Sequence, residues 1–115
     1  MEEALVTQNL PRDLEAEKSI LGSILIDPEV AITAAEMITG DDFYLKEHGV
    51  IFDTMINMYN NKITLDFVTL QDKLRETNLP EDTYSAEKIN SFMDIATTSA
   101  GIKHHCKIVY EKSVR

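Results

Sequence analysis

The stretch that decides the fold is DLEAEKSILGSILIDP, residues 13–28. Its apolar residues recur at helical spacing and lie on one face: Leu14, Ile20, Leu21, Ile24 and Leu25. Gly22 sits inside this pattern, where a glycine costs about 1 kcal/mol relative to alanine. We interpret it as the point where another helix approaches closely. The stretch therefore predicts an amphipathic helix packed tightly against a second helix, with Asp13 as its N-terminal cap.

Helical patterns continue along the rest of the chain. After a helix that opens at Leu10–Pro11, five more are expected, at 28–39, 46–60, 67–78, 86–96 and 102–115. Asp27 before Pro28, Asp66 and Ser85 are start signals, and Gly40 is expected to end the second helix. The weak strand candidate Ile63-Thr64-Leu65 is too short to form a sheet alone. The sequence therefore predicts an all-α fold, a compact bundle of about six helices.

At 115 residues, one domain is the default expectation. Residues 1–10 show no periodic pattern and are predicted to be a disordered tail, which leaves residues 11–115 as the helical domain. The expected core residues share a place on the apolar stripes; they are Leu21, Gly22, Leu25, Phe43, Ile51, Phe52, Leu70 and Leu74. Among them, Phe43 is expected to fill the space between the second and third helices.

Composition and charge exclude several classes of protein. The single cysteine, Cys106, rules out an intrachain disulfide, and the chain has neither a signal peptide nor an apolar run that could span a membrane. We therefore expect a cytoplasmic protein without membrane contacts. The net charge is −9, all of it from residues 1–60. Little or no direct DNA binding is expected, because neutralising phosphates requires clustered Lys and Arg.

No motif supports catalysis or a cofactor. The glycines form neither a GxxxxGK[ST] loop nor GxGxxG, and no GxSxG elbow is present. His104, His105 and Cys106 are adjacent, so a helix directs them about 100° apart and away from a common metal. Asp41 and Asp42 are better explained as a solvated or capping pair than as an acid–base pair. We expect no catalytic, cofactor-binding or metal-binding residue in this chain.

The last expected helix carries the candidate interface. Lys103, Lys107, Lys112 and Arg115 are opposed there only by Glu111, so a basic edge stands on an acidic domain. Such a charge division can steer self-association, although basic residues near a helix C-terminus also favour the helix dipole. The candidate partner or oligomer interface comprises Lys103, Lys107, Tyr110, Glu111 and Val114.

Four runs, in order along the chain, resemble the N-terminal region of DnaB-type replicative DNA helicases. They are Leu10–Pro11 with LEAEKSILGSILIDP at 14–28, DFY at 42–44 with His48, Ile51, Phe52 and Met55, LDFVTL at 65–70, and IVYEKS at 108–113. Each run is weak alone, and the four together cover nearly the whole chain from residue 10.

The resemblance implies the helical head of a hexameric bacterial helicase, cut before or within the helical hairpin that follows the head in that family. ATP, Mg²⁺ and the 5'-3' DNA helicase activity would belong to the motor domain of the full-length protein, and the head would support a subunit collar and a DnaG-type primase at the replisome. The expected function is therefore non-catalytic assembly and partner docking. The alternative is the helicase-interacting C-terminal domain of a primase, which is also a small helical bundle.

Overall fold

A computed structural model describes the backbone of residues 2–96 and 98–114 and the side chains of residues 14–96 and 98–114. It has six α-helices: α1 (Glu2–Ile26), α2 (Val30–Met37), α3 (Lys46–Asn60), α4 (Phe67–Leu74), α5 (Ala86–Ile95) and α6 (Ile102–Ser113). Two 3₁₀ turns, η1 (Gly40–Asp42) and η2 (Glu81–Tyr84), join them, and these described ranges contain no strand. The all-α prediction is confirmed.

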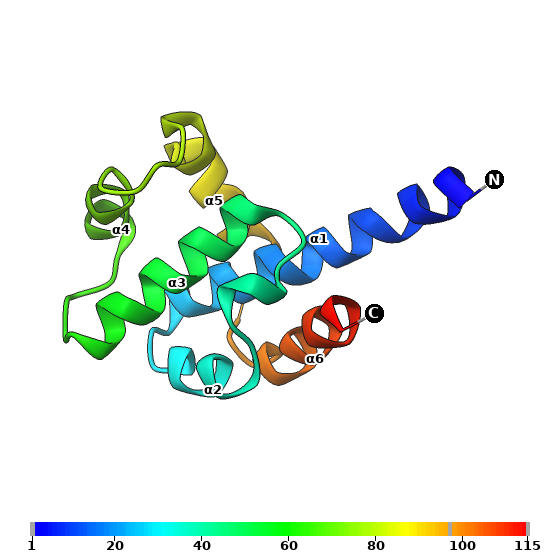
Figure 1. The fold of residues 1–115 in the computed structure, drawn as a ribbon. Helices are drawn as coiled ribbons and strands as arrows, with labels where there is room; N and C mark the ends of the chain where they lie inside the picture. Colours follow the sequence, from blue (N-terminus) through cyan, green and yellow to red (C-terminus); the bar gives the residue numbers. More distant parts are fainter. Residues whose placement is uncertain (1, 97, 115) are drawn as a thin grey trace.

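Helix α1 is the axis of the bundle. Its most extensive contacts are with α5 and α6, and α2 and α3 complete the packing around it (Figure 1). The N-terminal part of α1 extends beyond the other helices, whereas α6 returns alongside its middle. None of the described helices is both long and apolar enough to cross a bilayer.

One hydrophobic core joins residues from all six helices. Of the apolar residues predicted for it, six are buried: Leu21, Phe43, Ile51, Phe52, Leu70 and Leu74. Leu25 is the exception, because it lies at the edge of the core and is only half-buried. The predicted caps at Asp66 and Ser85 are both present, with side chains that accept the backbone N–H of Thr69 and Lys88 respectively.

The N-terminus differs from the sequence prediction. Residues 1–10 are predicted as a disordered tail, but α1 already begins at Glu2. Acidic residues and alanine at positions 2–4 favour the start of a helix. Pro11 removes one backbone hydrogen-bond donor, but the helix continues past it. The predicted cap at Asp13 lies outside the described side chains.

The second helix also begins and ends elsewhere than predicted. It starts at Val30 rather than Pro28, because the backbone from Asp27 to Ile32 first makes a tighter turn with hydrogen bonds three residues apart. It ends at Met37, and Gly40 opens η1 instead of capping the helix in a left-handed conformation. Position 40 requires a glycine for another reason. A Cβ there would lie 2.6 Å from the carbonyl oxygen of Gly49 on α3.

The close helix approach predicted at Gly22 is observed. A Cβ at this position would lie 2.7 Å from the carbonyl carbon of Phe92 and 2.9 Å from the Cβ of Ala96. Both neighbours belong to α5 or its C-cap, and the nearest atoms are backbone atoms, which cannot move aside as a flexible side chain can. The absence of a side chain at Gly22 therefore sets the distance between α1 and α5.

Gly22→Ala is expected to destabilise the domain by about 1–3 kcal/mol, the usual effect of overpacking a core. On an open helix the same substitution would stabilise by about 1 kcal/mol, so the sign of the change tests the packing directly. Urea unfolding followed by circular dichroism measures it. An unchanged or higher unfolding midpoint would show that α1 and α5 can move apart without loss of stability.

Candidate functional site

The five predicted interface residues are all exposed on the outer face of α6 and its C-cap. Lys103, Lys107, Tyr110 and Val114 follow one another at intervals of three or four residues, so they form one stripe along the helix. The exposed fractions of Tyr110 and Val114 are 48% and 63%. The opposite face of α6 holds Ile102, Cys106 and Val109 in the core. We call the four residues of the outer stripe, together with Glu111, the α6 surface.

No ion pair neutralises the charges of the α6 surface within the part of the chain whose side chains are described. Among the described residues, neither the two lysines nor Glu111 forms an ion pair. At its C-terminal end the helix is fixed to η1, because the Ser113 hydroxyl donates a 2.6 Å hydrogen bond to the Asp42 carboxylate. Asp42 also accepts the backbone N–H of Thr39, which agrees with a capping role and not an acid–base role. Arg115, the last of the predicted basic residues, lies outside the described residues.

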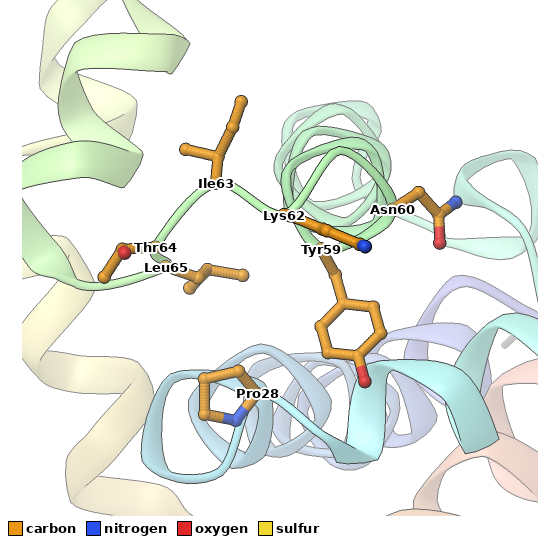
Figure 2. Close-up of a pocket in the computed structure, with 7 residues that line it drawn as sticks. All are labelled: Pro28, Tyr59, Asn60, Lys62, Ile63, Thr64 and Leu65. Carbon is orange, nitrogen blue, oxygen red and sulfur yellow. The ribbon is translucent and has the colours of Figure 1, made fainter.

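A second surface feature is a groove of ≈ 610 Å³ between the α1–α2 turn and the α3–α4 linker. Figure 2 shows Pro28 on one side of the opening, and Tyr59 and Leu65 on the other sides. Lys62 lies at its rim with a φ of 59°, the one left-handed non-glycine residue of the described chain. This groove cannot be predicted from local sequence patterns, because Pro28 and the residues of the α3–α4 linker that line it are more than 30 positions apart.

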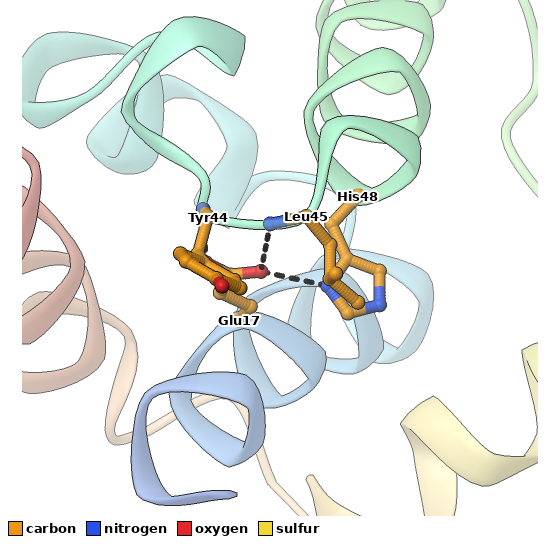
Figure 3. Close-up of polar contacts among 4 residues, drawn as sticks. All are labelled: Glu17, Tyr44, Leu45 and His48. Carbon is orange, nitrogen blue, oxygen red and sulfur yellow. Dashed lines mark hydrogen bonds and ion pairs between the residues drawn. The ribbon is translucent and has the colours of Figure 1, made fainter. Parts of the chain in front are cut away.

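A buried polar cluster lies at the base of the η1–α3 connection (Figure 3). Glu17 of α1 is 2% exposed, and its carboxylate accepts the backbone N–H of Tyr44 at 2.5 Å and that of Leu45 at 3.4 Å. Nδ1 of His48, on α3, lies 2.8 Å from the same carboxylate. In the tautomer that carries its hydrogen on Nδ1, His48 donates that hydrogen to the carboxylate.

The buried contacts of Glu17 with Tyr44, Leu45 and His48, called the Glu17 cluster below, were not predicted from the sequence. The position of Glu17 on its helix could have indicated them. Glu17 follows Leu14 by three positions and precedes Leu21 by four, so it lies on the buried face of its helix. The His48 ring also packs edge-on against Phe92 of α5, with ring centroids 5.7 Å apart. The cluster therefore joins α1, α3, α5 and the η1–α3 connection, which is a structural role.

His104, His105 and Cys106, which were predicted not to share a metal, lie in different surroundings. Cys106 is fully buried, whereas His104 is exposed and His105 is half-buried. Burial and the neighbouring His104 lower the pKa of His105. No group of three His, Cys, Asp or Glu side chains that could hold a metal occurs among the side chains of residues 14–96 and 98–114.

Burial raises the pKa of the Cys106 thiol to about 12, so the thiolate is scarce at neutral pH. We expect almost no alkylation of the folded chain by iodoacetamide at about pH 8, and complete alkylation once the chain is unfolded in guanidinium. Mass spectrometry counts the modified thiols. Rapid modification in native buffer would contradict the burial of this face of α6.

Comparison with known proteins gives consistent matches. Residues 9–111 match the family model described as the DnaB-like helicase N terminal domain. The chain is 32% identical over 104 residues to the replicative DNA helicase DnaC of Bacillus subtilis and 35% identical over 104 residues to the replicative DNA helicase DnaB of Pasteurella multocida. Each match covers 90% of this chain, but only 23% and 22% of the respective relative.

Solved structures show the same fold. The N-terminal domain of the DnaB helicase from Mycobacterium tuberculosis superposes with a TM-score of 0.81 at 26% identity, over 88% of this chain and 73% of that one. The N-terminal domain of the DnaB helicase from Helicobacter pylori, described together with its interactions with primase, gives a TM-score of 0.78 at 15% identity, over 94% and 84% of the two chains.

Proposed function

The chain belongs to the DnaB-like helicase N-terminal domain family, and from that premise we propose that it is a non-catalytic assembly and docking domain of a hexameric replicative DNA helicase. The family membership removes the alternative of a primase C-terminal domain, since the matched relatives are helicases. ATP and Mg²⁺ binding, and 5'-3' unwinding of DNA, are proposed for the rest of such a protein, because the chain spans less than a quarter of these relatives.

The observation that carries the proposal is the α6 surface. Two lysines, a half-exposed tyrosine and an exposed valine form one stripe, and no charge within the described domain neutralises it. Tyr110 supplies a large amphipathic side chain of the kind that dominates interfaces. The net charge of −9 provides the complementary surface on another copy of the domain. We propose that this surface contributes to subunit contacts in a collar.

Self-association of the isolated chain tests this proposal. We expect a monomer, or a weak dimer whose association falls as the salt concentration rises, because exposed charge pairs are screened over about 10 Å at 0.1 M salt. The double variant Lys103→Glu, Lys107→Glu should lose the association, whereas the matched control Lys88→Glu on α5 should keep it. Analytical ultracentrifugation at two salt concentrations measures both.

Other outcomes would overturn the proposal. A tight dimer or a stable hexamer that is indifferent to salt would show that apolar contacts elsewhere carry the interface. If the parent chain forms the weak dimer, equal association of the double variant and the control would exclude the α6 surface. In the same preparations we expect neither ATP hydrolysis nor strong DNA binding. ATP hydrolysis would contradict the non-catalytic assignment, and strong DNA binding would contradict the expectation drawn from the net charge of −9.

Docking of a DnaG-type primase is the second part of the proposal. It is supported by the fold shared with the Helicobacter pylori domain, whose structure was described with its interactions with primase. Binding of a purified primase C-terminal domain, measured by titration calorimetry with this chain and with a version extended by the following residues of its gene, tests it. Absence of binding by both versions would refute it.

A further inference from the structure

The outer face of α2 carries acidic residues around an exposed isoleucine. Ile32 is 51% exposed, and Glu29 and Glu36 are exposed on either side of it along the chain. The three residues are spaced by three and four positions, so they form one stripe on the side of α2 opposite the buried Ala31 and Ala34. Helix α2 holds no basic residue, and neither glutamate forms an ion pair with a described residue. We call these three residues the α2 stripe.

The α2 stripe complements the α6 surface in charge and in spacing. Lys103 and Lys107 of the α6 surface are both exposed. At 1.5 Å per residue, these lysines are about 6 Å apart along α6, and the two glutamates are about 10 Å apart along α2. Lysine has a flexible four-carbon side chain, which spans a difference of this size. Ile32 lies between the two glutamates and Tyr110 follows the two lysines, so an apolar contact accompanies the ion pairs when the two stripes meet.

Helices α2 and α6 begin near each other and end near each other in the domain. The hydroxyl of Ser99, which precedes α6, donates a 3.5 Å hydrogen bond to the carboxylate of Asp27, which precedes α2. At the other end, Ser113 of α6 donates to Asp42 of the η1 turn that follows α2. The two helices also pack against each other, and Figure 1 shows them side by side. The acidic and the basic residues therefore lie on neighbouring helices that run in the same general direction.

We propose that two copies of this domain bind each other about a twofold axis, with the α2 stripe of each copy on the α6 surface of the other. The inference rests on the proposed role of the α6 surface in subunit contacts, and it names the surface that the α6 surface binds. Because α2 and α6 are neighbours that run the same way, a twofold rotation sets each of them antiparallel to its counterpart and forms both contacts at once. Lys103 then faces Glu36, and Lys107 faces the Glu29 end of the α2 stripe.

The size of the two surfaces makes this a weak dimer. Helices of 8 and 12 residues offer little area compared with the roughly 1,200 Å² that a stable interface buries. Ion pairs at exposed positions contribute little each and are screened by salt. The dimer therefore forms at high protein concentration and low salt, with a dissociation constant no weaker than about 1 mM.

Exchange of charge between the two stripes tests the proposal, with dimerisation measured by analytical ultracentrifugation at low salt and up to about 1 mM protein. The acidic variant Lys103→Glu, Lys107→Glu and the basic variant Glu29→Lys, Glu36→Lys should each dimerise at least about tenfold more weakly than the parent chain, because like charges then face each other. An equimolar mixture of the two variants should dimerise as the parent does. In the mixed pair, one contact is the original one and the other has both of its charges exchanged.

The matched control is Glu87→Lys, Asp94→Lys, which reverses two exposed charges with the same spacing on α5 and should dimerise as the parent does. A parent chain that stays monomeric up to about 1 mM, a basic variant that dimerises like the control, or a mixture that does not recover would each overturn the twofold contact. Growth beyond the dimer would overturn it as well, because it indicates head-to-tail contacts. The role of the α6 surface fails separately, when the acidic variant dimerises as strongly as the parent.

Discussion

Phe43→Ala is expected to lower the free energy of unfolding by about 3–5 kcal/mol, the usual effect of truncating a buried phenylalanine. Phe43 is 7% exposed at the C-cap of η1, and its ring lies 5.1 Å from that of Phe52 on α3. Truncation removes this aromatic contact and leaves a cavity between the η1 turn and α3. Urea unfolding followed by circular dichroism measures the change.

The neighbouring residue provides the control. Tyr44 is 61% exposed, so Tyr44→Ala is expected to change the stability by no more than about 0.5 kcal/mol. A small effect of Phe43→Ala, equal to that of Tyr44→Ala, would show that the η1–α3 connection does not depend on this side chain. If the large effect is found, it approaches the whole stability of a small domain, about 5–15 kcal/mol. Variants meant to probe partner binding therefore belong at exposed positions, such as those of the α6 surface.

Periodicity predicted most of the fold because the deciding interactions are local. The stripes of α3, α5 and α6 repeat every three to four residues, and the caps at Asp66 and Ser85 are hydrogen bonds to residues three positions away. Such signals lie within a single turn of helix, so they can be read from a short window of sequence.

Where the prediction was wrong or incomplete, the cause is contact between distant residues. Gly40 looks like the end of a helix, but its small size serves the contact with Gly49 and Asp53 of α3, and the Asp53 carboxylate accepts its N–H at 3.0 Å. Leu25 fits the apolar stripe of α1 but lies where the helix leaves the core. Neither outcome can be read from local spacing.

The two candidate sites also differ in whether local sequence spacing can predict them. The α6 surface follows from the sequence, since the residues opposite a buried helical stripe must be exposed. The groove at Lys62 does not, because Pro28 and Leu65 come together only when α1 and α3 pack. Surface chemistry on one helix is predictable, whereas a concave site between elements requires the tertiary structure.

Glu17→Ala is expected to destabilise the domain by about 3–5 kcal/mol, although it removes a charge from a domain that is already acidic. The carboxylate accepts hydrogen bonds from Tyr44, Leu45 and His48, and it is almost completely buried. Removal leaves two part-buried backbone N–H groups and the buried imidazole N–H without this acceptor. Each such buried group costs about 1–3 kcal/mol. Urea unfolding of the variant and the parent chain measures the total loss in the free energy of unfolding.

Two further variants separate hydrogen bonding from charge and volume. Glu15→Gln removes the same charge two residues earlier, at an exposed position of α1, and is expected to change stability by no more than about 0.5 kcal/mol. In the double variant Glu17→Leu, His48→Leu, both partners of the buried contact become apolar, so part of the loss should be recovered relative to Glu17→Ala. Recovery cannot be complete, because the N–H groups of Tyr44 and Leu45 still lack an acceptor. Full recovery would show that these two backbone groups reach water, and that Glu17 does not fix the η1–α3 connection to α1.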